Sequence, residues 1–555
     1  IMIFKFISDM AIATGSSEYL AYFGLLIPIL IIAFIVSCNN NTTSKKRNVF
    51  RMNFNFGLSS MDPAFAKDQG TMWADVQLFN GLVQIDSNMN VIPCIAKSWK
   101  ISNDGLTYEF NLRNDVFFHD HEKFANGKGR KVVAQDFVYS LNRLIDSTVA
   151  STGGWLFNGK VAKENPFEAT NDSTFIIHLQ NPFKPMLGLL TLQYCSVVPK
   201  EIVDFYGKDF RSNPVGTGPF KLVRWEENNV LVLKKNDNYF ETDAQGNKLP
   251  YLDGVRISFI ADRGAEFLEF SQGKIDFMTG LDISYKDKLL TTTGELQPEW
   301  KSKINFEKMP FLNTEYLGIS MAKQDCEALK NKKVRQAINY AIDRKKMISY
   351  LRNGVGVAAE NGMIPNGLPC FDANVKGYTY DVEKAKKLLI EAGYPNGKGI
   401  SEIKIYSNPT YSDLITNIAN ELASIGIICK IENTPATFLR EAMRKNEVGF
   451  FRASWIGDYP DGENYLALFY SKNDAPPNYT YFKNTQYDKI YEQAIKETNA
   501  EKATALYHQL DKIIIEEAPV VPLFYDELTR FSHKNVSGLT KNSMNLVILK
   551  NAKLN

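Results

Sequence analysis

The sequence contains few of the residues on which most enzyme active sites depend. Only five of its 555 residues are histidines. It has no HExxH pair for a catalytic zinc, no GxSxG turn with triad partners and no phosphate-binding P-loop. The turn Gly216-Thr217-Gly218 has neither the lysine nor the following helix that phosphate binding requires. These absences predict that the protein is not an enzyme.

The six cysteines are not spaced like metal or redox sites. None forms a CxxC pair or a cysteine/histidine cluster of the kind that binds zinc. We therefore expect free or buried thiols, with at most one or two disulfides. The charge is nearly balanced, at +2 from 64 basic and 62 acidic side chains. Nothing in this balance predicts a nucleic acid or an anionic lipid as the main partner.

One short segment, His119-Asp120-His121-Glu122, has the residue types that could hold a divalent ion at an exposed site. It lies beside a stretch before Val132 that is rich in polar residues and predicts a surface loop. We favour a solvated loop over a metal site here. No metal and no cofactor are therefore expected.

The composition is that of a soluble globular protein, with 44% hydrophobic and 23% charged residues. A chain of this length is too long for one hydrophobic core, and at about 150 residues per domain it predicts three or four units. Aromatic residues make up 12%, which suits a core and also a pocket that accepts varied side chains.

The N-terminus predicts export. An apolar run over residues 20–36 contains Pro28 and is slightly shorter than the ~20 residues of a membrane-spanning helix. It ends in Ser37-Cys38, which resembles the lipobox read by lipoprotein signal peptidase. We expect residues 1–37 to be a lipoprotein signal peptide, Cys38 to carry the lipid, and residues 38–48 to be a polar tether. The alternative is an uncleaved membrane anchor, and both interpretations place the rest of the chain outside the cytoplasm.

Local patterns predict strands and helices from Val49 onward. Alternating apolar residues indicate strands at residues 49–56 and 106–112, the second preceded by an Asp104-Gly105 turn. A helix is expected around residues 73–82 and another over residues 380–392, ending at Gly393. Two glycines and two prolines predict a rigid turn over residues 214–219.

A series of motifs in a fixed order carries a family resemblance. They are SMDP (60–63), LFNGL (78–82), IAKSW (95–99), DGLTYEFNLR (104–113), VVAQDFVYSL (132–141), NPVGTGPF (213–220), KKVRQAINYAIDR (332–344), YDVEKAKKLLIEAGY (380–394) and APVVPLF (518–524). Together they resemble the family 5 (cluster C) bacterial extracellular solute-binding proteins of oligopeptide- or dipeptide-binding type, which are ABC transporter subunits. The resemblance covers essentially everything from about Val49 to the end.

This resemblance implies an α/β, bilobed periplasmic-binding-protein fold (type II, cluster C) with an extra inserted subdomain in lobe one. Lobe one would comprise residues 49–83, 209–304 and 525–555, and the inserted subdomain residues 84–208. Lobe two would comprise residues 305–524. Two crossing strands would form the hinge, with ligand held in the cleft between the lobes.

The segment GFFRASWIGDYPD (449–461) resembles the cleft strand of peptide-binding members, "RxxWxxDYxxP". Carried over by position, Asp458 would bind the peptide α-amino group and Arg452 its carboxylate. Ser454 and Ile456 would pair with the peptide main chain, and Trp455 belongs to the same motif. Arg452 also fits an ion pair in the core or between lobes, and Asp458 also fits a capped turn.

The chemistry of the segment agrees with peptide binding. A carrier of varied peptides must recognise amide groups and two charged ends, and main-chain pairing does this without reading side chains. Arg452, Ser454, Ile456 and Asp458 have the same parity and share one face of an extended strand, whereas Phe451, Ala453 and Trp455 share the other. The order of charges predicts a peptide that runs antiparallel to this strand.

Further expectations follow from the resemblance. In lobe one, Gln69 lies on a predicted loop, residues 67–70, that would touch the ligand backbone. The partners would be a peptide, ABC permease subunits in the inner membrane, and the membrane itself through the lipid anchor. The protein would be a monomer on the periplasmic side of the membrane or at the cell surface. The alternative is a same-fold receptor for another solute, such as a nickel chelate or sugar, or a sensor lipoprotein.

Overall fold

The computed structural model describes residues 48–282, 284–323 and 326–555. The expected signal peptide, Cys38 and the tether up to residue 47 lie outside the described residues. No helix in the described part of the chain is long and apolar enough to cross a membrane. Below, lobe one, the inserted subdomain and lobe two denote the residue ranges predicted above, which remain a prediction.

The strand expected at Val49 lies at one edge of a four-stranded sheet. The order is β1 (Val49–Asn53), β10 (Gly254–Ser258), β9 (Val230–Lys235) and β8 (Phe220–Glu226). β1 runs parallel to β10, and the other neighbours are antiparallel. Apolar side chains of these strands, including Phe50, Leu231 and Ile257, are buried in one core with the inserted subdomain.

Helix α3 (Gln69–Leu78) begins earlier than the sequence predicted, because Asp68 caps it. The Asp68 carboxylate accepts a hydrogen bond from the Thr71 N–H (3.0 Å), which satisfies one of the free donors of the first turn. The loop expected over residues 67–70 is therefore wrong for Gln69, which is the first residue of the helix.

The turn at residues 214–219 packs against the end of α3 and requires its glycines. A Cβ on Gly216 would lie 2.1 Å from the Leu78 carbonyl oxygen, and one on Gly218 would lie 2.4 Å from the Leu78 carbonyl carbon. Neither contact is tolerable, so the two glycines allow the close approach of two backbones.

His119 holds this turn from the other side, and the solvated loop expected for it is wrong. The ring is buried, with Nε2 2.9 Å from the Gly218 oxygen and Nδ1 3.4 Å from the Gly216 nitrogen. The Gly216 N–H donates to Nδ1, so Nε2 carries the proton and donates to Gly218. Burial lowers the His119 pKa to about 4. Nowhere in the described ranges do three or more metal-ligating side chains gather into a possible metal site.

The inserted subdomain is built on a second antiparallel sheet. Its order is β4 (Ala96–Ile101), β5 (Thr107–Leu112), β7 (Thr174–His178) and β6 (Phe167–Asn171), and the predicted turn at Gly105 joins β4 to β5 with a φ of 70°. A hairpin of β2 (Val83–Ile85) and β3 (Val91–Pro93) precedes it. Its helices are α4 (Ala134–Ile145), α5 (Met186–Leu189) and α6 (Lys200–Tyr206).

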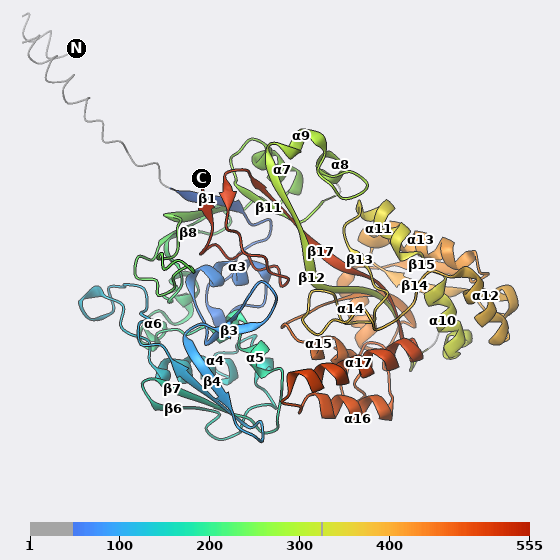
Figure 1. The fold of residues 1–555 in the computed structure, drawn as a ribbon, viewed down its shortest axis with the longest axis horizontal. Helices are drawn as coiled ribbons and strands as arrows, with labels where there is room; N and C mark the ends of the chain where they lie inside the picture. The colour runs from blue at the N-terminus through green and yellow to red at the C-terminus, as the bar shows by residue number, and fades with distance from the viewer. Residues whose placement is uncertain (1–47, 283, 324–325) are drawn as a thin grey trace, which may run out of the picture. The chain divides into compact units, whose positions relative to one another are not determined.

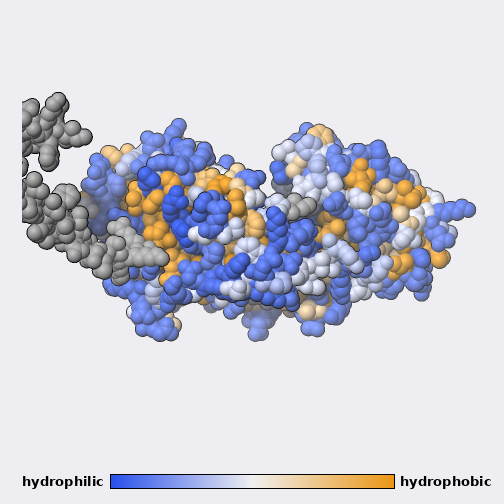
Figure 2. All heavy atoms as spheres, turned by 90° about the horizontal axis from the view of Figure 1, so that it is seen from above, coloured by the Kyte–Doolittle hydropathy of each residue, from blue (hydrophilic) through white to orange (hydrophobic). Residues whose placement is uncertain are grey.

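Two long strands, β12 (Ile304–Ile319) and β17 (Val520–His533), run side by side through the middle of the fold (Figure 1). They pair antiparallel along most of their lengths, with one register shift between Pro310 and Thr314 and a second between Glu315 and Tyr316. At the lobe-one end β17 also pairs with β11 (Phe277–Thr279). Viewed from above, the surface is largely hydrophilic. Its outline has a notch at the top of the view, near the middle of the molecule (Figure 2).

The same sheet continues into lobe two. Beyond β12 come β16 (Phe450–Ile456), β14 (Ile403–Ser407) and β15 (Cys429–Asn433), and β13 (Val357–Ala358) pairs with β17. The helices of this region are α10 (Lys332–Tyr340), α11 (Arg344–Arg352), α12 (Val382–Glu391), α13 (Ser412–Ala423), α14 (Ala436–Arg444), α15 (Glu463–Leu466), α16 (Thr485–Ala494) and α17 (Ala500–Glu517). In lobe one, α7 (Arg263–Ser271), α8 (Lys286–Leu289) and α9 (Pro298–Lys301) precede β12, and β18 (Val536–Ser537) pairs with β19 (Lys553–Leu554) near the C-terminus.

Cysteine chemistry follows the sequence prediction. In the described residues Cys94, Cys195, Cys326, Cys370 and Cys429 are free thiols. Burial raises the pKa of Cys94 and of Cys370 to about 12, which keeps both protonated and unreactive at neutral pH.

The buried His119 predicts a loss of stability in mild acid. The unfolded chain takes up a proton at a pKa of about 6.5, whereas the folded chain does so only at about 4. The stability that the neutral His119 ring contributes to the folded chain is therefore fully present above pH 6.5 and is lost as the pH falls towards 4. Linkage gives a loss of about 2 kcal/mol in the His119 contribution to the free energy of unfolding from pH 7.5 to pH 5. Urea denaturation at the two pH values measures it.

Two variants separate this effect from general weakening of the turn. His119→Gln removes the titrating ring, so its free energy of unfolding should fall by about 2 kcal/mol less than that of the wild type over the same pH change. Thr217→Ala weakens the same turn, where Thr217 bonds Asn80, without removing a titrating group, and should keep the wild-type pH dependence. An equal pH dependence in His119→Gln and the wild type would contradict the assignment.

Candidate ligand-binding site

Strand β16 has the two faces that its sequence predicted. Phe451 and Ala453 are buried in the apolar core of lobe two, and Trp455 packs against the same core. On the other face, Ser454 is half-buried and Ile456 is 52% exposed. The face with Ser454 and Ile456 is therefore the one open to a ligand.

The backbone of β16 has one paired edge and one that is partly open. The Gly457 N–H donates to the Leu312 oxygen (2.7 Å), and the Ser320 N–H donates to the Gly449 oxygen (2.8 Å), so odd-numbered residues bond to β12. Successive residues of a strand direct their hydrogen-bonding groups to opposite edges, so Ser454 and Ile456 direct theirs towards the β14 side.

On that side the ladder with β14 consists of the pair Tyr406 and Phe451. Among the described strands none pairs with β16 beyond this point. The main chain of residues 454–456 is therefore available for pairing with an extended ligand.

A rigid turn places Asp458 at the end of this open edge. Asn464 Oδ1 accepts from the Asp458 backbone N–H (3.2 Å) and from Trp455 Nε1 (2.8 Å), which ties the turn to the strand. Gly457 is needed here because a Cβ would lie 2.7 Å from the Tyr465 hydroxyl, which donates to the Leu312 oxygen.

The Asp458 side chain is accessible to solvent, but protein atoms surround much of its carboxyl group. Desolvation by the surrounding protein raises the pKa of Asp458. A hydrogen bond with the Asn464 side chain opposes this effect in part. No cation of the described chain contributes to this balance. A desolvated carboxylate without a counter-charge is suited to bind a positively charged ligand group.

Tyr194 of the inserted subdomain lies within electrostatic range of Asp458. Burial raises its pKa, and the negative charges of Asp458 and Asp68 raise it further, so all three groups lie within electrostatic range. The Tyr194 hydroxyl is 3.1 Å from Thr152 Oγ1, and its ring lies against Gly153. The structure therefore brings together one acidic residue from lobe two, one from lobe one and a phenol from the subdomain.

Gln69, the residue after Asp68, lines a separate cavity. This cavity of about 60 Å³ lies within lobe one and is also lined by Asn55, Trp73 and Arg263. That volume holds a few water molecules and is too small for a peptide.

Arg452 is buried and paired with Glu315 of β12. Its Nε bonds the Glu315 carboxylate, and its guanidinium carbon lies 3.3 Å from the centre of the Tyr411 ring. Burial raises the pKa of Glu315, while the charge of Arg452 lowers it. Arg452 Nη2 is buried without a hydrogen-bond partner among the described residues. The core ion pair that the sequence left open as an alternative is thus present, and one buried guanidinium donor is left without a hydrogen bond.

The chain is similar to known proteins along most of its length. Residues 90–477 match the family model "Bacterial extracellular solute-binding proteins, family 5 Middle". The heme-binding protein A of Haemophilus influenzae is 30% identical over 469 residues, which cover 80% of this chain and 81% of that protein. The glutathione-binding protein GsiB of Escherichia coli K12 is 26% identical over 526 residues, which cover 93% and 95%.

The chain belongs to family 5 of the bacterial extracellular solute-binding proteins.

Solved structures identify the fold of this family 5 protein. The periplasmic binding protein DppA of Helicobacter pylori, in complex with the peptide STSA, has a TM-score of 0.71 at 27% identity, covering 91% of this chain and 97% of that one. HbpA2 of Haemophilus parasuis has a TM-score of 0.80 at 24% identity, covering 92% and 100%. The predicted α/β periplasmic-binding-protein fold of cluster C is confirmed. The chain is an extracytoplasmic solute-binding protein of ABC import rather than an enzyme, as the sequence predicted.

Sequence reasoning missed three residues of this site. Glu315 is the only charged residue in the second half of β12. An isolated charge of this kind predicts a buried partner but does not identify it as Arg452. Asn464 lies six residues after Asp458, outside the motif of residues 449–461 from which the site was predicted. Tyr194 carried no local signal, because only the folded chain brings it near Asp458.

The Arg452–Glu315 pair predicts strong coupling between the two side chains. Glu315→Leu leaves a buried guanidinium without its counter-charge and should lower the free energy of unfolding by about 3 kcal/mol or more. Arg452→Leu should cost a similar amount, and the double variant should regain much of the combined loss. Urea denaturation of the four proteins measures this cycle. Strictly additive losses would contradict it, and Glu432→Gln, which breaks an exposed pair with Lys430, should change nothing measurable.

Proposed function

We propose that this family 5 protein binds short peptides in extended form along the open edge of β16 and delivers them to an ABC permease. The observation that carries the proposal is Asp458, a desolvated carboxylate without a cation, at the end of an unpaired strand edge. Ser454 and Ile456 offer main-chain groups to the peptide backbone, and Asp458 receives the α-amino group. A peptide bound in this way runs antiparallel to β16.

The names of its relatives support a peptide or peptide-like solute. DppA of Helicobacter pylori was solved with a bound peptide, and GsiB is named for glutathione, which is itself a short peptide. The Haemophilus relative is named for heme, so heme is the competing ligand in the test below. In the proposed site Arg452 Nη2 donates to the peptide carboxylate, and Trp455 supports the strand from its core side.

The first test is a cycle of two proteins and two ligands. A tetrapeptide with a free amine should bind the wild type at least about 30-fold more tightly than its N-acetylated form, since losing one partner of a shielded charge pair costs about 2 kcal/mol or more. Asp458→Asn should bind both forms with the weaker affinity. Isothermal titration calorimetry measures all four combinations.

The control is Asp237→Asn, which removes an exposed acid in lobe one and should behave as the wild type. Equal affinities of the wild type for the free and acetylated peptides would reject Asp458 as the amine site. Binding of heme, with no binding of any peptide, would reject the proposed function.

We also propose that Cys38 carries a lipid that anchors the protein on the outer side of the cell membrane. Wild-type protein should then be recovered in the membrane fraction, with an N-terminal peptide that begins at an acylated Cys38. Cys38→Ala should lose that modification and the mature N-terminus, whereas Cys94→Ala should keep both. Fractionation with mass spectrometry of the N-terminal peptide decides this. A wild-type protein that retains residues 1–37 would contradict it.

A further inference from the structure

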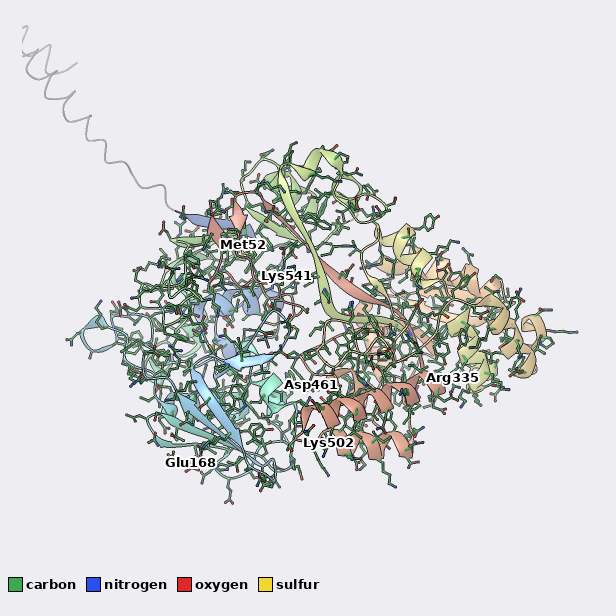
Figure 3. The ribbon with its side chains drawn as sticks, viewed as in Figure 1. Met52, Glu168, Arg335, Asp461, Lys502 and Lys541 are labelled. Carbon is green, nitrogen blue, oxygen red and sulfur yellow. The ribbon has the colours of Figure 1, made fainter. Side chains whose placement is uncertain are left out.

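The turn that follows Asp458 fastens lobe two to the inserted subdomain. Asp461 Oδ2 lies 2.6 Å from Lys184 Nζ, and the two side chains are only 10% and 23% exposed. The backbone N–H of Lys184 also donates to the Ile495 oxygen (2.8 Å), just after α16. Figure 3 shows Asp461 between α5 of the subdomain and α17 of lobe two.

Tyr459 joins the two regions by apolar packing. It is the only described residue of lobe two in the core shared by lobe one and the subdomain, and it is 6% exposed. Pro460 and the Tyr459 ring lie over Gly188, each 3.8 Å from the position of a Cβ there. The Tyr459 hydroxyl donates to the carboxylate of Glu463, which also accepts from Tyr491, so the ring is held from within lobe two.

The ion pair between Lys184 and Asp461 can separate without leaving either charge buried and unpaired. Within lobe two, Asp461 Oδ1 accepts from the Tyr507 hydroxyl (2.7 Å) and from the Glu463 N–H (3.0 Å). Separation of the lobes would therefore leave Asp461 hydrogen-bonded, and Lys184 would reach water. Neither group is buried alone in the open state, so opening avoids the large cost of an unpaired buried charge.

We propose that Lys184 and Tyr459 act as a latch that sets how long a ligand stays bound. They are positioning residues rather than ligand contacts, and the proposal about ligand residence rests on the proposed function. Asp458 is one residue from Tyr459, and Asn464 fixes the turn to β16. A ligand held by Asp458 and by the subdomain therefore favours the state in which the latch is closed.

The kinetic test compares substitutions at one position. Lys184→Met should raise the dissociation rate of a bound tetrapeptide about tenfold with little change in the association rate, because truncating a shielded charge pair acts mainly on dissociation. Lys184→Arg keeps the charge and should restore a dissociation rate near that of the wild type. Lys502→Met removes an exposed lysine on α17 and should have no effect. Stopped-flow measurements with a fluorescent tetrapeptide give both rates.

A ligand-free measurement separates the latch from the choice of ligand. Small-angle X-ray scattering of Lys184→Met should show a larger radius of gyration than the wild type, and Lys184→Arg should not. This difference supports the latch even if no peptide binds the wild type, an outcome that would reject only the proposed function. Equal radii of gyration for Lys184→Met and the wild type, with dissociation rates within twofold where a peptide binds, overturn the latch.

Discussion

The hydrogen-bonded ladder between β12 and β17 is the constraint on which the rest of this fold depends. β17 runs from lobe two into lobe one, and β12, which begins where lobe one ends, pairs with it along most of this length, so both lobes are connected to the same pair of strands. The ladder is interrupted between Pro310 and Thr314, where Asn313 bonds Asp526 across the gap (3.3 Å). A bulge bends a strand locally and leaves the pairing on each side intact. The two strands therefore stay paired on both sides of this interruption.

The proposed ligand-binding edge lies one strand away from this ladder. β16 pairs with the second half of β12, and the buried Arg452–Glu315 pair joins the same two strands through their side chains. The segment that carries Ser454, Ile456 and Asp458 is therefore held rigidly to one half of the hinge. In the proposed arrangement the inserted subdomain supplies Tyr194 near Asp458, and it supplies Lys184 to the ion pair with Asp461 rather than to the ligand. A ligand that contacts both sides stabilises the closed arrangement, which is how hinge-closing binding proteins couple binding to conformation.

Local sequence signals predicted the parts of the fold that local physics determines. The parity of residues 451–456 gave the two faces of β16, and the glycines and prolines of residues 214–219 gave a tight turn, since both depend on neighbouring residues alone. Gln69 was placed wrongly although Asp68 offers an N-cap signal for α3. His119 was placed wrongly because its partners lie nearly a hundred residues away in the turn it supports. The pairing of Arg452 with Glu315, 137 residues apart, likewise emerges only when β12 and β16 become neighbours.

The open edge of β16 has a consequence for the state of association of the protein. An unpaired strand edge is a template on which a second copy of a chain can add a strand and begin to aggregate. Here the open stretch covers only residues 454–456, since β14 occupies the edge before it and the Gly457 turn ends the strand after it. Such a stretch offers enough main-chain groups for a short extended molecule and too few to hold a whole strand of another protein. The shortness of this edge thus protects an exported protein from edge-to-edge self-assembly.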